Sequence, residues 1–253
     1  MSSTESDDEV GLGEDWLRLL EDLDRISTYY DEGNKILSFG SDIQLRSRLL
    51  AESLPGLGSG RFVDVGCGPG TMSVLALSLR PGMTGVLLDP LPSMLGEAIR
   101  KLGEESCDYV SGVFESLPFR SEGFVACLAG FTLRDARHRL VAYQEIRRVL
   151  KNSAPLILID LGKPDSAIKR FLVSIYWKYI APFRLRMALG ERGKPFADIY
   201  LTYKHLPVNR VLVSDIEKNV GPVKCEKRML DGVVMIMAVK GSNGSPFRYQ
   251  LNL

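Results

Sequence analysis

The chain has 253 residues, enough for one large α/β domain with appended segments. Its 32 lysines and arginines balance 31 aspartates and glutamates, so no overall positive charge points to a nucleic-acid partner. No apolar run reaches the length of a membrane-spanning helix, and none is expected. Four scattered cysteines without a C-x-x-C pair predict free thiols in a reducing compartment, and no metal site is expected.

Helices and strands are expected to alternate along the chain. Residues 1–15 are acidic and polar, lack the features of a signal peptide, and are expected to be disordered. Residues 16–26 and 46–53 have helical patterns. From residue 62 to 160, apolar runs of strand length alternate with helical segments, which is typical of a parallel sheet covered by helices on both faces. We expect strands at 62–65, 85–89, 107–112, 124–129 and 155–160, and helices at 71–79, 93–102 and 136–150.

The remaining residues predict a helical segment and a hairpin. Residues 168–189 are apolar and basic with a helical pattern, and 214–220 is expected to be a short helix. Residues 223–227 and 233–239 are expected to form an antiparallel hairpin. We therefore expect a single α/β domain over residues 16–241, followed by a loose tail over 242–253.

The stretch from Arg61 to Thr71 organises the chain. An apolar strand breaks into a G-x-G-x-G turn, and glycines are needed where the backbone bends sharply and lies close against a ligand. The three glycines are Gly66, Gly68 and Gly70. Asp89 ends the next strand, where a carboxylate can accept both hydroxyls of a ribose, and Asp64 can orient the loop or reach an ammonium group through water. The pattern resembles the S-adenosylmethionine (SAM) site of Rossmann-like methyltransferases; the alternative is a tight strand–helix turn in another α/β protein.

Four further stretches match motifs of one family. Its N-terminal Y-D-x-x-N-x-x-x-S-x-G corresponds to Tyr30, Asp31, Asn34, Ser38 and Gly40. Its G-D-A-E-x-L-P-F corresponds to residues 112–119, its F-G-L-R-N to 131–135, and its R-V-L-K-P-G-G to 148–154. Over residues 28 to 241 the chain thus resembles the ubiquinone/menaquinone biosynthesis C-methyltransferases of the UbiE/MenG type.

The resemblance implies a fold, a cofactor and a reaction. The fold is a Rossmann-like class I methyltransferase, an α/β fold with a seven-stranded, mostly parallel sheet, a C-terminal antiparallel hairpin and helices on both faces. Residues 16–55 would form lid helices and 161–212 a substrate-side insertion. The reaction would transfer the methyl group of SAM to a ring carbon of a prenylated quinol. The implied cofactor-binding residues are Asp64, Gly66, Gly68, Gly70, Asp89 and Phe114.

Three positions depart from the family pattern. Val113 stands where the family presents an aspartate to the adenine amino group, so the cofactor would depend on the backbone N–H of Phe114 and on stacking. Asp135 replaces an asparagine, and Leu45 replaces a tryptophan. These changes suggest a divergent branch and leave the exact substrate open.

The implied chemistry needs a base or an oxyanion stabiliser. A ring carbon is a better nucleophile once the neighbouring hydroxyl is ionised, and a phenol titrates near ~10. Arg134 can supply fixed positive charge to the phenolate, and Asp135 can accept the hydroxyl proton, which an asparagine cannot. Asp31 is a second candidate base, and His138 and His205 are weaker ones. On the lid side of the substrate pocket we expect Tyr30, Asp31, Asn34 and His205.

Simpler interpretations stay open at this point. A helix cap and a surface charge would also explain Arg134 and Asp135. Packing and capping of a helix would explain Tyr30 and Asp31, and a structural role would explain His205. Two other functions are also open. One is a SAM-dependent methyltransferase for another small or lipid acceptor, and the other is a non-catalytic scaffold in a membrane biosynthetic complex.

The segment 168–186 mixes bulky apolar residues with lysines and arginines. It can pack over the substrate cavity with its cations at the rim, or lie at a membrane surface and admit an isoprenoid tail. We therefore expect a cytoplasmic protein with peripheral contact at the inner face of the membrane. Its partner would be a lipid quinol rather than nucleic acid, and a homodimer is left open.

Overall fold

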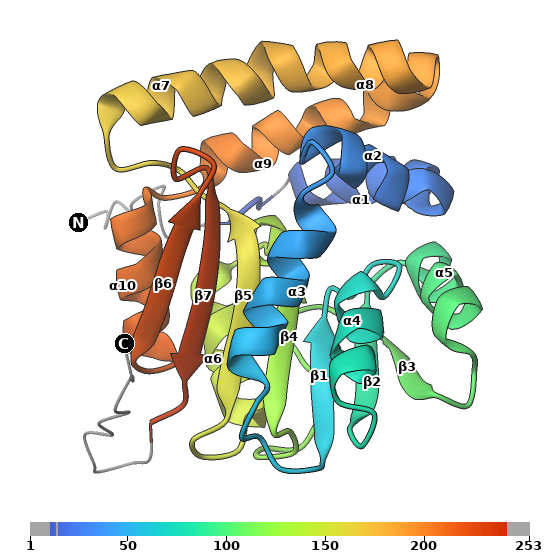
Figure 1. Ribbon diagram of the computed structural model, residues 1–253, viewed down its shortest axis with the longest axis vertical. Helices are drawn as coiled ribbons and strands as arrows, with labels where there is room; N and C mark the ends of the chain where they lie inside the picture. Colours follow the sequence, from blue (N-terminus) through green and yellow to red (C-terminus); the bar gives the residue numbers. More distant parts are fainter. Residues whose placement is uncertain (1–10, 14, 242–253) are drawn as a thin grey trace, which may run out of the picture.

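A seven-stranded sheet forms the centre of the computed structural model, which describes residues 11–13 and 15–241 (Figure 1). The strand order is β3-β2-β1-β4-β5-β7-β6. The strands are β1 (Arg61–Val65), β2 (Thr84–Asp89), β3 (Cys107–Ser111), β4 (Ala126–Gly130), β5 (Pro155–Leu161), β6 (Val223–Arg228) and β7 (Val233–Val239). The first five are parallel, and β7 runs antiparallel between β5 and β6. The predicted fold class, including the C-terminal hairpin, is confirmed.

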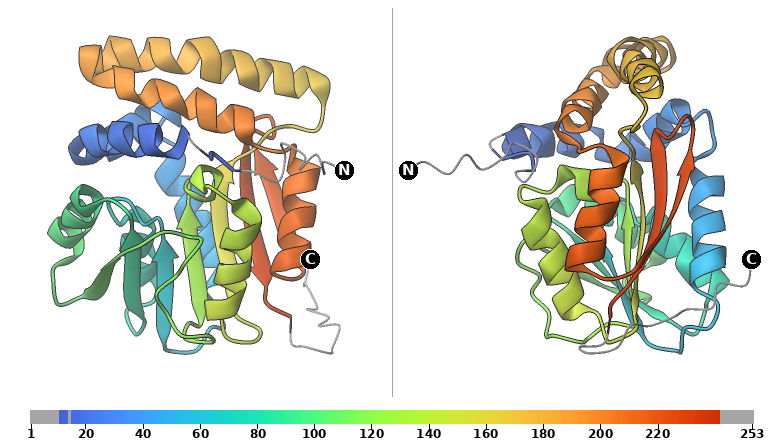
Figure 2. Two further views of the ribbon diagram at one scale, coloured as in Figure 1. Left: turned by 180° about the vertical axis from the view of Figure 1, so that it is seen from behind. Right: turned by 90° about the vertical axis from the view of Figure 1, so that its left-hand side faces the viewer.

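Helices cover both faces of the sheet, which explains why its central strands are almost continuously apolar. One face carries α3 (Asp42–Ser53), α4 (Thr71–Leu79) and α5 (Pro92–Leu102). The other face carries α6 (Arg139–Val149) and α10 (Asn209–Asn219). The edge-on view of Figure 2 shows α3 on one side of the sheet and α6 and α10 on the other.

A helical layer lies across the carboxyl ends of the parallel strands, at the top of Figure 1. It joins two segments far apart in sequence through a shared apolar core that includes Ile26, Trp177, Leu185 and Phe196. Because ligands of open α/β sheets bind at the carboxyl ends of the strands, this layer covers the expected site. Its elements are α1 (Asp15–Ile26), η1 (Ser27–Tyr29), α2 (Tyr30–Leu37), α7 (Ala167–Ile175), η3 (Tyr176–Ile180), α8 (Ala181–Leu189), η4 (Gly190–Asp198) and α9 (Ile199–His205).

Several boundaries differ from the sequence prediction. The helix expected from residue 136 begins at Arg139, because Leu133–Asp135 form a separate turn, η2. The helix expected over 214–220 begins earlier, at Asn209, and buries Leu212 and Ile216 on one face. The predicted helical segment 168–189 contains a π-helical turn, η3.

The glycine in α2 has a packing role. A Cβ atom on Gly33 would lie 2.0 Å from the ring of Phe196, so α2 approaches η4 closely only because this position lacks a side chain. This contact sets how α2 is rotated over the site.

The predicted tails, 1–15 and 242–253, lie mostly outside the described residues. In the described part of the first tail, Leu12 is buried and its N–H donates to the carbonyl of Ala136 at 3.0 Å. The four cysteines are free thiols, three of them buried. Within residues 11–13 and 15–241, no helix is long and apolar enough to cross a membrane.

Candidate active site

The glycine turn after β1 is tightly packed at its two ends and open in its middle. All three glycines have a positive φ, 60° for Gly66, 51° for Gly68 and 76° for Gly70. A Cβ on Gly66 would lie 2.0 Å from Thr132 Oγ1, and one on Gly70 would lie 3.2 Å from Ala98. A Cβ on Gly68 would meet no atom closer than 4.0 Å. The turn therefore leaves one bare backbone face toward the adjoining cleft, where a ligand can lie.

Asp89 organises this turn from the end of β2. Its Oδ2 accepts the N–H of Gly68 at 2.8 Å, and its Oδ1 accepts the N–H of Leu91 at 3.0 Å. Burial raises the pKa of Asp89 to about 6, although both backbone hydrogen bonds favour the charged form. Each oxygen keeps a further lone pair, so the carboxylate can still accept hydroxyl groups of a ligand in the cleft.

Asp64 lies beneath the turn rather than in the cleft. Its Oδ2 accepts a hydrogen bond from Ser73 Oγ at 2.6 Å, which joins β1 to α4. In the described part of the chain its Oδ1 has no hydrogen-bond partner, and burial raises the pKa of Asp64 to about 7. Of the two roles expected for Asp64, this placement fits orientation of the loop.

The cofactor cleft lies between the glycine turn and helix α1. Only about 50 Å³ of it is free, because apolar side chains of α1 close over it. Residues of α1, which the sequence analysis assigned to a lid, therefore form one wall of this cleft. Besides the glycine turn, the lining residues include Trp16, Leu19, Leu20, Leu23, Tyr30, Arg46, Asp89, Leu91, Met94, Phe114, Gly130, Phe131, Thr132 and Asp135.

A second, larger cavity of about 310 Å³ adjoins the cleft under α7 and η3. Its lining is mostly apolar, with Asn34, Asp42 and Arg134 as its main polar residues. Phe131 lines both spaces, so the cofactor cleft and the apolar cavity meet at this residue. The apolar residues of the cavity include Leu37, Phe39, Leu45, Leu161, Leu172, Val173, Tyr176, Trp177, Ile199, Met229, Leu230 and Val233.

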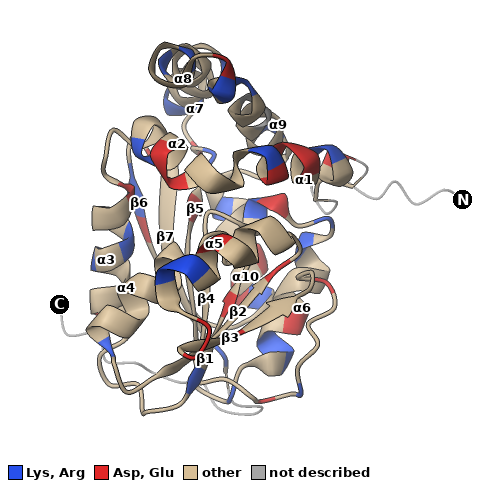
Figure 3. Cartoon of the chain, turned by 90° about the vertical axis from the view of Figure 1, so that its right-hand side faces the viewer, with Lys and Arg blue, Asp and Glu red and all other residues tan. Residues whose placement is uncertain are grey.

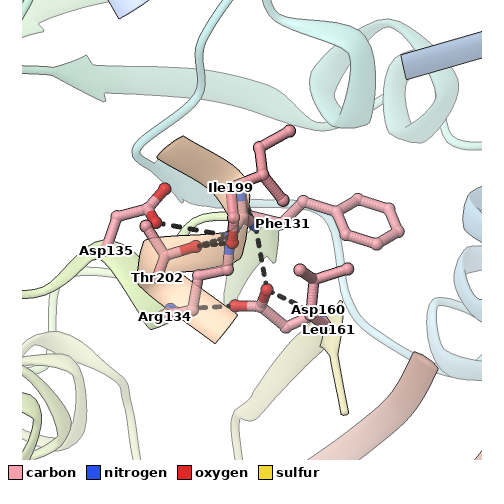
Figure 4. Close-up of polar contacts among 7 residues, drawn as sticks. All are labelled: Phe131, Arg134, Asp135, Asp160, Leu161, Ile199 and Thr202. Carbon is pink, nitrogen blue, oxygen red and sulfur yellow. Dashed lines mark hydrogen bonds and ion pairs between the residues drawn. The ribbon is translucent and has the colours of Figure 1, made fainter. Parts of the chain in front are cut away.

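Arg134 is fixed at the junction by a dense set of polar contacts (Figure 4). Its Nη1 donates to Asp160 Oδ1 at 3.0 Å and to the carbonyl of Phe131, and its Nε donates to Thr202 Oγ1 at 3.3 Å. Its backbone N–H donates to Asp160 Oδ2 at 3.0 Å. Burial lowers the pKa of Arg134, but the carboxylates of Asp135 and Asp160 raise it more, so the guanidinium stays charged.

Asp135 lies beside Arg134 and faces the cofactor cleft. Its Oδ1 is 3.3 Å from Arg134 Nε but accepts no hydrogen bond within the described residues. Burial raises the pKa of Asp135 to about 7, against the opposing effect of the Arg134 charge. A carboxyl group with such a pKa exchanges a proton near neutral pH, which suits a general base.

The backbone at Phe131 is unusual for a residue with a large side chain. Its φ is 61°, in the left-handed region that residues other than glycine rarely adopt. Its N–H donates to the carbonyl of Ile159 at 2.7 Å, and its carbonyl accepts from Arg134. The surrounding contacts thus hold the ring between the two spaces.

Of the three α2 residues expected on the lid side of the pocket, two line the described cavities and one does not. Tyr30 lines the cofactor cleft and Asn34 the apolar cavity, and burial raises the pKa of Tyr30. Asp31 accepts a hydrogen bond from Thr71 at 3.0 Å, forms an ion pair with Lys101, and is absent from both linings. The structure therefore does not bring Asp31 into the described cavities.

The two histidines also lie apart from the junction. His205 has a side chain 37% exposed, lies 3.6 Å from Asp15, and lines neither of the two described spaces. His138 precedes α6, and its N–H donates to Glu115 at 3.0 Å. By contrast Phe114, expected beside the adenine, does line the cofactor cleft.

The sequence analysis missed two residues that position Arg134. Asp160 is the penultimate residue of β5, and a carboxylate at the carboxyl end of a parallel strand is a signal that could have identified it. Thr202 lies on α9, and nothing in the sequence pattern marked it.

The fold, the glycine turn and the carboxylate after β2 together define a class I SAM-dependent methyltransferase. Residues 17–218 match the model of the ubiE/COQ5 methyltransferase family, and the chain belongs to this family. It is therefore an enzyme that uses SAM as methyl donor.

Relatives and solved structures agree with this assignment. The demethylmenaquinone methyltransferase of Roseiflexus castenholzii is 30% identical over 177 residues, 70% of this chain and 73% of that protein. The ubiquinone/menaquinone biosynthesis C-methyltransferase UbiE of Syntrophotalea carbinolica is 32% identical over 161 residues, 63% of this chain and 68% of that protein. A solved SAM-dependent methyltransferase from Aquifex aeolicus has the same fold, with a TM-score of 0.54 at 17% identity, and covers 82% of this chain and 98% of its own.

We predict that Gly68→Val and Asp89→Ala each weaken SAM binding by about 100-fold or more. Gly68→Val fills the bare face of the turn. Asp89→Ala removes a charged hydrogen-bond acceptor, and each hydrogen bond to a charged group contributes about 1.5–3 kcal/mol of binding free energy. Isothermal titration with SAM measures the effect. Gly82→Ala, in open space outside the cleft, is the control. Normal SAM affinity in both site variants, with a native circular dichroism spectrum, would rule out the assignment.

Proposed function

We propose that this enzyme methylates a ring carbon of a prenylated quinol, such as a demethylmenaquinol or a ubiquinol precursor. The observation that carries the proposal is the junction at Phe131, where a large apolar cavity meets the cofactor cleft. A fixed guanidinium and a carboxyl group with a pKa near 7 lie at this junction. The names of the relatives in Roseiflexus and Syntrophotalea point to the same substrate class.

The residues of the cleft fit SAM. The bare face of Gly68 offers room close to the backbone, Asp89 can accept the ribose hydroxyls, and Phe114 can lie against the adenine. SAM supplies an electrophilic methyl group on a sulfonium. The helices α1 and α2 would close over the bound cofactor and exclude water from it.

Arg134 and Asp135 would divide the activation of the quinol between them. A hydroxyl at the junction can give its proton to Asp135, and the resulting phenolate lies in the field of Arg134. Arg134 needs no rearrangement for this role, because Asp160, Thr202 and a backbone carbonyl already fix its orientation. Ionisation of the hydroxyl would make the neighbouring ring carbon nucleophilic enough to take the methyl group as its bond to the sulfonium breaks. The proton on that ring carbon would then be lost, which restores the aromatic quinol.

The apolar cavity suits a hydrocarbon tail and has an apolar rim. Phe39, Leu172, Met229 and Leu230 line the cavity and are also exposed at the surface. An isoprenoid chain can therefore extend through this rim while the ring stays at the junction.

The helical segment from α7 to α8 has two apolar faces. Its buried residues recur at every fourth position, which is more than the ~3.6 residues in one turn of an α-helix. The π-helical turn η3 accommodates an extra residue and so keeps the buried residues on one side of the segment. They are Val173, Trp177, Ala181, Leu185 and Leu189. The segment contains no acidic residue, and Figure 3 shows its lysines and arginines in blue at the top of the molecule. Its exposed apolar residues are Ile168, Phe171, Leu172, Tyr179, Ile180, Phe183 and Met187.

This outer face supports a peripheral contact with the membrane. Exposed apolar and aromatic side chains among cations are the pattern of a helix that lies in a lipid interface. The rim of the substrate cavity shares Leu172 with this face, so a lipid quinol can pass from the bilayer into the cavity. This face supports our proposal of a peripheral membrane contact, which the sequence analysis expected at the cytoplasmic side.

We predict that Asp135→Asn lowers the single-turnover rate about 10²–10⁴-fold while SAM and quinol still bind. In the wild type, kcat/KM should rise with pH through about 7 as the Asp135 carboxyl loses its proton. The variant should lack this inflection, and its residual rate should climb at high pH as hydroxide ionises the quinol. If Asp31→Asn is inactive and Asp135→Asn fully active at neutral pH, the base is on α2 instead.

We also predict reversible binding to anionic vesicles that weakens as salt rises, because salt screens the cations of α7 and α8. Phe171→Glu combined with Phe183→Glu should abolish sedimentation with vesicles. Leu17→Glu, at an equally exposed apolar residue of α1, should leave it unchanged. A protein that stays in the supernatant at low salt contradicts the proposal. A dimer that dissociates in the double variant would instead make this face an interface between two copies.

A further inference from the structure

Arg46 is a buried cation that forms no ion pair within the described residues, although its charge favours the ionised form of the buried Asp64. It lies on α3, is 4% exposed, and lines the cofactor cleft. Among the described residues its guanidinium forms no hydrogen bond or ion pair, and its Nε is fully buried. The contact that the structure gives it is with the ring of Phe131, whose centroid lies 4.9 Å from Arg46 Cζ.

A guanidinium buried without an ion pair is energetically unfavourable in a protein that has no ligand bound. A buried charge is normally paired, because removing it from water is costly, and an aromatic ring compensates only part of that cost. Arg134, on the other side of Phe131, shows the usual arrangement, with the carboxylates of Asp135 and Asp160 against its guanidinium. Among the described residues, Arg46 has no carboxylate in direct contact with its guanidinium, and Asp64 acts on it only through its charge.

The backbone of β4 is shaped to admit this side chain. A Cβ on Gly130 would lie 2.6 Å from Arg46 Nη1 and 2.5 Å from Met72 Cγ. Gly130 also lines the cofactor cleft. The absence of a side chain at this position lets the guanidinium reach the cleft at the end of β4.

We propose that Arg46 binds the α-carboxylate of the methionine part of SAM. This inference rests on the proposed use of the cleft. Asp89 marks the ribose end at β2, and Arg46 lies beside Gly130 at the end of β4, with β1 and its glycine turn between them. A ligand that extends across the turn from Asp89 presents its amino-acid end to Arg46. The carboxylate is the anionic group that SAM carries, and it matches the planar donor fork of arginine.

Binding of two analogues isolates the carboxylate. S-adenosylhomocysteine carries it, whereas 5′-deoxy-5′-(3-aminopropylthio)adenosine has the same atoms without it. Arg46→Met should bind S-adenosylhomocysteine about 10–100-fold more weakly than the wild type, and the decarboxylated analogue equally well. Arg46→Lys should lose less, because it keeps the charge. Arg48→Met, two residues along α3 at an exposed ion pair with Glu52, should change neither affinity.

Each outcome separates the inference from the proposed function. Equal losses for both analogues in Arg46→Met, or no loss for either, would overturn the role of Arg46 while the cofactor site stands. The same holds if Arg46→Met fails to fold and the uncharged, polar variant Arg46→Gln binds both analogues as the wild type does. If the wild-type protein binds neither analogue, the cofactor assignment itself fails.

Discussion

The ion pair between Asp160 and Arg134 is the interaction on which the site depends. One carboxylate at the end of β5 holds both the guanidinium and the backbone N–H of Arg134, and thereby fixes the whole turn η2. Phe131 and Asp135, on either side of Arg134, take their positions from the same turn. Burying two charges is costly, but the additional hydrogen bonds that Arg134 donates to Thr202 and to the carbonyl of Phe131 reduce that cost. The chain thus gives up some stability to hold a fixed positive charge beside the cofactor cleft.

The fold separates two chemical environments that the reaction brings together. The cofactor cleft combines the backbone of the glycine turn after β1 and the Asp89 carboxylate at the end of β2 with apolar side chains of α1, which suits a nucleoside. The second cavity is built from residues of α2, α3, α7, η3 and α9 and from the turn between β6 and β7, and its mostly apolar lining suits a hydrocarbon. Phe131 lies where they meet, so a ring carbon and a methyl donor can approach each other there with little water between them.

The sequence predicted the parts of the molecule that are set locally. Parallel strands are buried on both faces, so their apolar runs were visible, and the turn at Gly66 to Gly70 followed from spacing alone. The position of Asp31 outside both described cavities was not visible, because it depends on how α2 packs against Phe196, more than 150 residues away. The lack of a hydrogen-bond partner for Arg46 Nε was hidden for the same reason, since it is apparent only when the neighbours in space are known.

The most direct test of the central claim is the structure of the product made by the purified enzyme. We would incubate it with SAM and demethylmenaquinol, and analyse the extracted lipid by mass spectrometry and NMR. The account predicts a quinol that is one methyl group heavier, with that methyl on a ring carbon. It also predicts no product from the oxidised quinone, whose ring carbon has no ionisable hydroxyl to activate it. Methylation on oxygen, or equal turnover of the oxidised form, would contradict the account.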